Sequence, residues 1–113
     1  MTTIFARILK GEIPCSKVYE DNLVLAFDDV TPQAPVHVLI IPKTPLVNLN
    51  DVDASHEQLL GHLLTTARLV AEKKGIAAGG YRIVMNTGEN GGQSVYHMHL
   101  HVLGGRPLAW PPG

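Results

Sequence analysis

The sequence has little of what marks several protein classes. Its 113 residues include one cysteine, Cys15, so no internal disulfide can form, and we expect a protein of a reducing compartment, the cytoplasm. Nine basic residues stand against ten acidic ones, and this formal net charge of -1 excludes an extended basic surface for nucleic-acid polymers. No apolar run approaches the ~20 residues that span a membrane, and no signal-peptide pattern opens the chain. We therefore expect one soluble domain, residues 1–113, small enough that dimerisation would help to bury its surface.

Three histidines alternate with apolar residues near the end of the chain. His97, His99 and His101 lie within the run Val95 to Leu103, which predicts a strand. Because strand side chains alternate between faces, the three imidazoles are expected to share one face. The residues expected on the opposite, buried face are Tyr96, Met98, Leu100 and Val102. Neighbouring rings would lie ~6.5 to 7 Å apart along a strand, so the middle ring, His99, is the expected centre of any chemistry.

A glycine-rich segment, Asn86 to Ser94, comes immediately before the histidine run. Glycines allow backbone N–H groups to approach an anion closely. The sequence therefore predicts a loop that holds an anion beside the histidines.

The rest of the chain predicts two helices and four further strands. A short helix is expected from a cap at Thr2 or Thr3 to Gly11, and a long one from Asp53 or Ser55 to about Lys74. The expected strands are 17–20, 23–29, 36–41 and 81–86.

The long helix is expected to cover the sheet. Ser55 and Gln58 have the spacing of a capping box, and His56 and His62 are expected at the surface or at an interface. The expected buried face consists of Leu59, Leu60, Leu63, Leu64, Ala67 and Ala71.

Two polar residues stand in otherwise apolar strands. Asp29 shares a strand face with Phe27 and is either a solvated strand end or an acceptor for a sugar diol. His37 shares a face with Leu39 and is either a core histidine or a functional one. In the proline-rich tail, Trp110 is expected to dock on its own chain or across a dimer interface.

Three interpretations of the histidines compete. Two of the three alternating histidines could bind zinc with His37 as a third ligand, but the histidine run has no adjacent carboxylate or thiolate to complete the set of zinc ligands. A purely structural role at an interface leaves the glycine-rich segment without a purpose. Nucleophilic catalysis on phosphorus uses both segments, because neutral imidazole is a good nucleophile near pH 7 and its neighbours can hold its tautomer. We therefore expect an enzyme that needs no metal and no cofactor.

The residues that carry this chemistry also resemble a known family. The run from Gly92 to Leu103 resembles the histidine triad signature, His-x-His-x-His followed by two apolar residues. The ending Trp110-Pro111-Pro112-Gly113 is similar to that of the Hint branch of the histidine triad (HIT) family, as are Ile4-Phe5, 27–29 and 31–37. The resemblance spans essentially the whole chain.

The resemblance implies an α+β HIT fold with a five-stranded antiparallel sheet, a short N-terminal helix and one long helix, dimerising into a ten-stranded sheet. It also implies a purine nucleoside phosphoramidase. Such an enzyme hydrolyses adenosine or guanosine 5'-phosphoramidates and acyl or aminoacyl adenylates through a nucleotidyl-histidine intermediate. The expected partners are purine nucleoside monophosphate derivatives and a second copy of the chain, with no nucleic-acid polymer and no membrane.

The resemblance also implies a role for individual residues. His99 matches the nucleophile, His101 the phosphate contact, and Ser94 the group that assists the leaving nitrogen, while His97 and His37 extend the histidine array. The implied nucleotide-binding residues are Ile4, Phe5, Ile8, Phe27, Asp29, Val30, Leu39, Asn86, Gly92, Gln93, Ser94, Val95, His99, His101 and Trp110. Among them Asp29 matches the ribose-binding acid, and Trp110 matches a tail residue that reaches toward the other subunit's site.

Two alternatives remain open at this point. One is a dinucleoside polyphosphate hydrolase of the sister branch, which Ser94 and the Trp-Pro-Pro-Gly ending disfavour. The other is a non-catalytic purine nucleotide sensor or adaptor.

Overall fold

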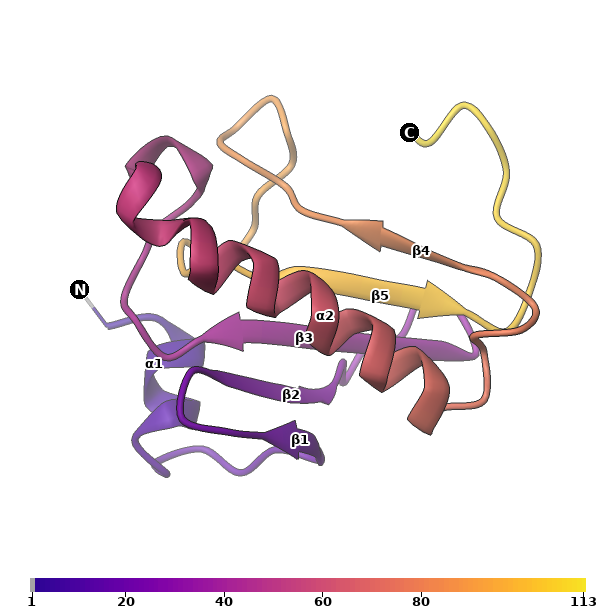
Figure 1. Cartoon of the computed structure of the whole chain (residues 1–113), viewed down its shortest axis with the longest axis horizontal. Coiled ribbons are helices and arrows are strands. Elements are labelled where there is room, and N and C mark those ends of the chain that lie inside the picture. The colour runs from indigo at the N-terminus through magenta and orange to yellow at the C-terminus, as the bar shows by residue number, and fades with distance from the viewer. Residues whose placement is uncertain (1) are drawn as a thin grey trace.

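The computed structural model describes residues 2–113 and forms one antiparallel sheet flanked by two helices (Figure 1). The strands are β1 (Lys17–Glu20), β2 (Val24–Asp28), β3 (Val36–Pro42), β4 (Tyr81–Val84) and β5 (Leu100–Gly104), in the spatial order β1-β2-β3-β5-β4. The helices are α1 (Ile4–Leu9) and α2 (Glu57–Lys73), with 3-10 turns at Leu49–Asp51 and Ala54–His56. The expected α+β fold is confirmed. Within residues 2–113, no helix is long and apolar enough to cross a membrane.

Local hydrogen bonds explain where the first elements begin and end. The Thr3 hydroxyl accepts from the backbone N–H of Ala6 and caps α1, and Gly11 follows the helix with a φ of 77° that favours glycine. Between β1 and β2 the Asp21 carboxylate accepts from the N–H groups of Leu23 and Val24. The expected short helix and tight turn are therefore both present.

Both faces of the sheet are covered, which explains why β3 is apolar except at His37. On one face Val38 and Ile40 pack under α2 together with Val102 of β5. On the other face Leu39 and Ile41 pack with Phe5 of α1. Full burial of each such aliphatic side chain stabilises the fold by ~1.5 to 3 kcal/mol.

The start of α2 and part of its buried face differ from expectation. Asp53 caps the preceding 3-10 turn, and its box partner is the His56 imidazole, because that turn delays the α-helix to Glu57. Leu64 is 54% exposed, since the stripe that faces the sheet runs along another line of the helix. The buried residues of α2 are Leu63, Thr66, Ala67, Val70 and Ala71.

The histidine run is only partly a strand, which corrects the expected range of 95–103. β5 begins at Leu100, whose partner on β3 is Ile40. Pairing with β3 stops at this pair, two residues before Pro42, which has no N–H to donate, and the Met98 N–H instead donates to the Leu46 carbonyl over 2.8 Å. Met98 is still buried beside Leu100 as expected, but Tyr96 is 47% exposed and does not share that buried face.

Candidate functional site

A cavity of about 300 Å³ lies on the sheet face opposite α2. It brings together residues from α1, β2, β3 and the histidine run. Of the residues expected to bind a nucleotide, it is lined by Ile4, Phe5, Ile8, Phe27, Asp29, Val30, Leu39, Ser94, Val95, His99 and His101. The cavity therefore has an apolar part and a part with histidines and a carboxylate, as a small amphipathic ligand needs.

Aromatic contacts join the two parts of the cavity. The Phe5 ring meets Phe27 edge-on with centroids 5.6 Å apart, and it meets His99 in the same way at 5.0 Å. Edge-to-face packing of this kind orients both rings. Phe5 thus fixes the plane of the imidazole that the sequence indicates as the centre of the site.

The backbone before β5 sets the tautomer of His99. Its Nδ1 lies 2.8 Å from the His97 carbonyl oxygen, which can only accept, so Nδ1 carries the proton. The His97 ring is held in turn, because its Nε2 donates to the Pro42 carbonyl over 2.8 Å. The lone pair of neutral His99 is consequently on Nε2, the atom that a nucleophile needs.

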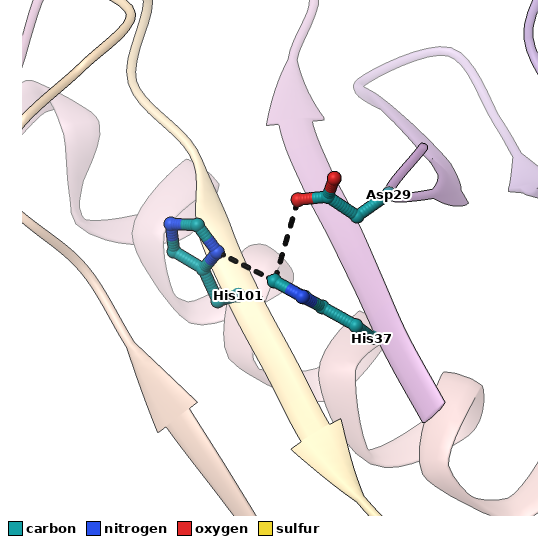
Figure 2. Close-up of side chains that lie close together, drawn as sticks. All are labelled: Asp29, His37 and His101. Carbon is teal, nitrogen blue, oxygen red and sulfur yellow. Dashed lines mark hydrogen bonds and ion pairs between the residues drawn. The ribbon is translucent and has the colours of Figure 1, made fainter. Parts of the chain in front are cut away.

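A second set of hydrogen bonds sets the tautomer of His101, as Figure 2 shows in part. The Gln33 N–H donates to His37 Nδ1 over 3.0 Å, so the proton of neutral His37 is on Nε2. That Nε2 lies 2.9 Å from His101 Nδ1 and 3.4 Å from Asp29 Oδ2. His101 Nδ1 therefore accepts, and its own proton is on Nε2. We call the chain from Gln33 through His37 to His101 the histidine relay.

Burial keeps these rings uncharged. Burial lowers the pKa of His99, although the hydrogen bond to the His97 carbonyl opposes this shift. Burial also lowers the pKa of His37, although the negative charge of Asp29 opposes that shift. Burial, together with the neighbouring rings of His99 and His37, lowers the pKa of His101 to about 4. At neutral pH the site holds one imidazole with a free lone pair beside another with a free N–H.

Asp29, His37 and His101 offer ligand atoms that all lie within 4.8 Å of one another, a spacing that suits a metal ion. The expectation that no carboxylate accompanies the histidines is thus wrong, because the β2–β3 connection brings Asp29 to them. A metal on His37 Nε2 would have to displace the proton that the Gln33 N–H keeps there. The hydrogen bonds thus favour proton positioning over metal binding.

The glycine-rich segment is held by a buried side chain. The Gln93 amide nitrogen donates to the carbonyls of Val47 and Val95, and its oxygen accepts from Gly88 N–H and the Asn48 amide. All of its polar atoms are thus used within the protein. Gln93 shapes the loop and does not line the cavity.

Several expected site residues lie outside the cavity. Asn86 donates to the Gly91 carbonyl, and Gly92 makes a turn with a φ of 76°, so both act within the loop. His37 and His97 are buried behind the cavity-lining histidines. The lone tryptophan, Trp110, is 80% exposed, so docking on its own chain is wrong.

Four lining residues were missed by the sequence interpretation: Ile13, Pro14, Cys15 and Asp28. The first three follow α1 and return toward the cavity. Their apolar character was visible in the sequence, but the direction of the chain after Gly11 was not.

Comparisons with known proteins find relatives over most of the chain. The family model of the HIT domain matches residues 10–108. The chain is 57% identical over 106 residues to the purine nucleoside phosphoramidase of Escherichia coli K12, covering 94% of this chain and 89% of that protein. It is 53% identical over 113 residues to the adenylylsulfatase HINT1 of Arabidopsis thaliana, covering 98% and 76%.

Solved structures show the same fold. A crystal structure of a HIT family hydrolase from Legionella pneumophila superposes with a TM-score of 0.96 at 48% identity, covering 99% of this chain and 100% of that one. The family model, these relatives and the shared fold lead to one conclusion: this chain belongs to the HIT family.

Proposed function

We propose that this protein is a hydrolase that cleaves the P–N bond of purine nucleoside 5'-phosphoramidates through a nucleotide bound covalently to His99. The observation that carries the proposal is the tautomer of His99, whose Nδ1–H donates to the His97 carbonyl and leaves Nε2 unprotonated. The name of the Escherichia coli relative supports the same substrate class.

The cavity suits the three parts of such a substrate. The base packs against the apolar part, which includes Phe5, Phe27 and Leu39. Asp29 accepts from the ribose hydroxyls. The phosphoryl group then lies between His99, His101 and Ser94.

In the first step His99 Nε2 attacks phosphorus and the P–N bond breaks. The amine leaves with a proton that the Ser94 hydroxyl relays from solvent. The N–H on His101 Nε2 stabilises the phosphoryl oxygens without giving up its proton. Nδ1–H of the modified His99 is still bonded to the His97 carbonyl, which favours the positive charge that the ring acquires.

In the second step water attacks phosphorus, the bond to His99 Nε2 breaks, and the nucleoside monophosphate is released. The water proton passes to solvent, and His99 returns to its starting tautomer. Acyl and aminoacyl adenylates fit the same sequence, with a carboxylate in place of the amine as leaving group.

Substrate comparison tests the proposal. Turnover of adenosine 5'-phosphoramidate should exceed turnover of diadenosine triphosphate. The reverse order would assign the chain to dinucleoside polyphosphate hydrolysis, and nucleotide binding without turnover of either compound would make it a sensor or adaptor.

A further inference from the structure

The β2–β3 connection is folded back onto His37. The N–H of Asp29 donates to the His37 carbonyl over 2.9 Å, and the N–H of Thr31 donates to Asp29 Oδ1 over 2.8 Å. These two bonds start the turn that brings the Gln33 N–H to His37 Nδ1. Gln33 therefore acts on the histidine relay through its backbone, and its exposed side chain only reaches the Thr31 carbonyl.

The residues that follow β5 contact this connection and fix its position. Arg106 Nη2 donates to the Gln33 carbonyl over 2.9 Å, and Arg106 Nη1 donates to the carbonyl of Pro107 over 3.0 Å. Gly105 is packed so closely that an added Cβ would lie 2.9 Å from Cβ of Pro35. The N–H and C=O of one residue, Gln33, are thus fixed on opposite sides, by His37 and by a charged guanidinium.

We propose that Arg106 is a positioning residue that selects the tautomers of His37 and His101. If the Gln33 N–H leaves His37 Nδ1, that atom can carry the proton and Nε2 becomes the acceptor. His101 Nδ1 then donates, and His101 Nε2 presents a lone pair to the cavity in place of an N–H. A lone pair repels phosphoryl oxygens, so loss of the Arg106 contact converts a stabilising group into an opposing one.

Other groups favour the same tautomer but do not replace the contact. Asp29 Oδ2 can accept from His37 Nε2–H, yet at 3.4 Å it is farther away than a good hydrogen bond. The Gln33 N–H is the group that reaches Nδ1 within the described part of the chain. Arg106 is therefore expected to act through Gln33 and not by touching a substrate.

Nitrogen NMR of protein with ¹⁵N-labelled histidine tests the proposal directly at neutral pH. In the unaltered protein His37 and His101 should each show an unprotonated Nδ1 and a protonated Nε2. In Arg106→Ala the four ring-nitrogen shifts should move toward averaged values, and Arg106→Lys should restore them because it still offers a donor. Arg68→Ala, which removes an exposed arginine of α2, is the matched control and should change nothing.

A second pair of variants addresses the amide itself. Gln33→Pro removes the N–H and should move the same shifts, whereas Gln33→Ala keeps the N–H and should not. Unaltered ring-nitrogen shifts in Arg106→Ala would overturn the proposal, whatever the result for Gln33→Pro.

The kinetic consequence rests on the proposed function. Arg106→Ala should lower kcat for adenosine 5'-phosphoramidate by ~10-fold with little change in KM, less than the 10²- to 10³-fold typical when a stabilising donor is removed outright. If the unaltered protein does not hydrolyse phosphoramidates, the proposed function fails while the NMR comparison still decides the tautomer proposal. Altered ring-nitrogen shifts in Arg106→Ala together with an unchanged kcat would show that the tautomers of His37 and His101 do not affect turnover.

Discussion

His99 combines a free lone pair, a fixed ring plane and a lowered pKa. The lone pair follows from the His97 carbonyl, the ring plane from Phe5, and the pKa from burial. The first two causes come from different segments of the chain. The same ring in an exposed strand would exchange tautomers and be partly protonated near its ordinary pKa of ~6.5.

Replacing this ring tests its role in chemistry. His99→Ala should lower kcat for adenosine 5'-phosphoramidate by ~10⁴-fold or more, as removal of covalent nucleophiles does elsewhere, because no other group offers a lone pair at that point. Affinity for adenosine monophosphate, measured by calorimetry, should stay within a few-fold. A variant with near-normal turnover would refute a covalent role for His99.

The lowered pKa values predict how activity depends on pH. His99 must be neutral to attack, and burial lowers its pKa from 6.5, so kcat/KM should stay level down to pH 6.5 and decline only below it. The Asp29 carboxylate raises the pKa of His37, His99 and His101, so Asp29→Asn should move this decline to still lower pH. An inflection above pH 6.5 would contradict the account.

The same shifts predict stability. The unfolded chain takes up protons on these histidines from about pH 6.5 downward, whereas the folded chain resists protonation until lower pH, about 4 for His101. The free energy of unfolding should therefore be highest above pH 6.5 and should fall progressively toward pH 4. Urea denaturation at several pH values measures this, and constant stability over that range would show that the rings titrate normally.

At the scale of elements, the site depends on where strands stop. Because pairing with β3 ends at Ile40, opposite Leu100, His97 and His99 lie in an irregular segment before β5, and only His101 is in the strand. The segment's carbonyls are then free to bond imidazoles instead of a neighbouring strand. The irregular backbone is the reason that His99, protonated on Nδ1, differs in tautomer from His97 and His101, which are both protonated on Nε2.

The glycine-rich loop is expected to depend on Gln93. Gln93→Ala removes the hydrogen bonds that the buried amide makes to the Gly88 N–H and the Val47 carbonyl, and a typical intramolecular hydrogen bond contributes ~0.5 to 1.5 kcal/mol to stability. We expect the free energy of unfolding in urea to fall by ~2 kcal/mol. Asn90→Ala, an exposed change in the same loop, is the control and should have no measurable effect. Equal stability of both variants would show that the Gln93 bonds do not hold the loop.

The sequence predicts some of these elements and not others. Alternation alone placed Phe27 with Asp29 and His37 with Leu39, and the structure has Phe27, Asp29 and Leu39 on one cavity. It could not show that the Gln33 N–H meets a ring four residues away, or that Arg106 reaches Gln33 from 73 residues along the chain. Such contacts depend on the path of the loops, and strand periodicity carries no information about that path.

At the scale of the whole molecule, one side of the fold is left uncovered. β4 is an edge strand, and a shallow apolar groove beside it is lined by Leu49, Leu60, Leu64, Ile83, Met85 and Leu100. Figure 1 shows the C-terminal tail on the β4 side of the sheet, where Arg82 of β4 donates to the carbonyls of Leu108 and Ala109. An exposed edge and exposed leucines suit the expected homodimer.

A charge on this surface tests dimerisation. The unaltered chain should have twice its monomer mass by light scattering, and Leu64→Glu should reduce it to the monomer mass because a carboxylate would be buried without a partner. Thr65→Glu places the same charge one residue along the exposed side of α2 and should leave the dimer intact. A monomeric unaltered chain would refute the expected assembly.

Trapping the intermediate shows whether a nucleotide becomes bonded to His99. The protein is mixed with adenosine 5'-phosphoramidate, quenched within a turnover without acid, because phosphorus–nitrogen bonds are acid-labile, and the adduct is located by tandem mass spectrometry. We expect one adenylyl group on His99 in the unaltered protein and none in His99→Ala. Turnover with no adduct on His99, or an adduct on another residue, would contradict the proposed covalent role of His99.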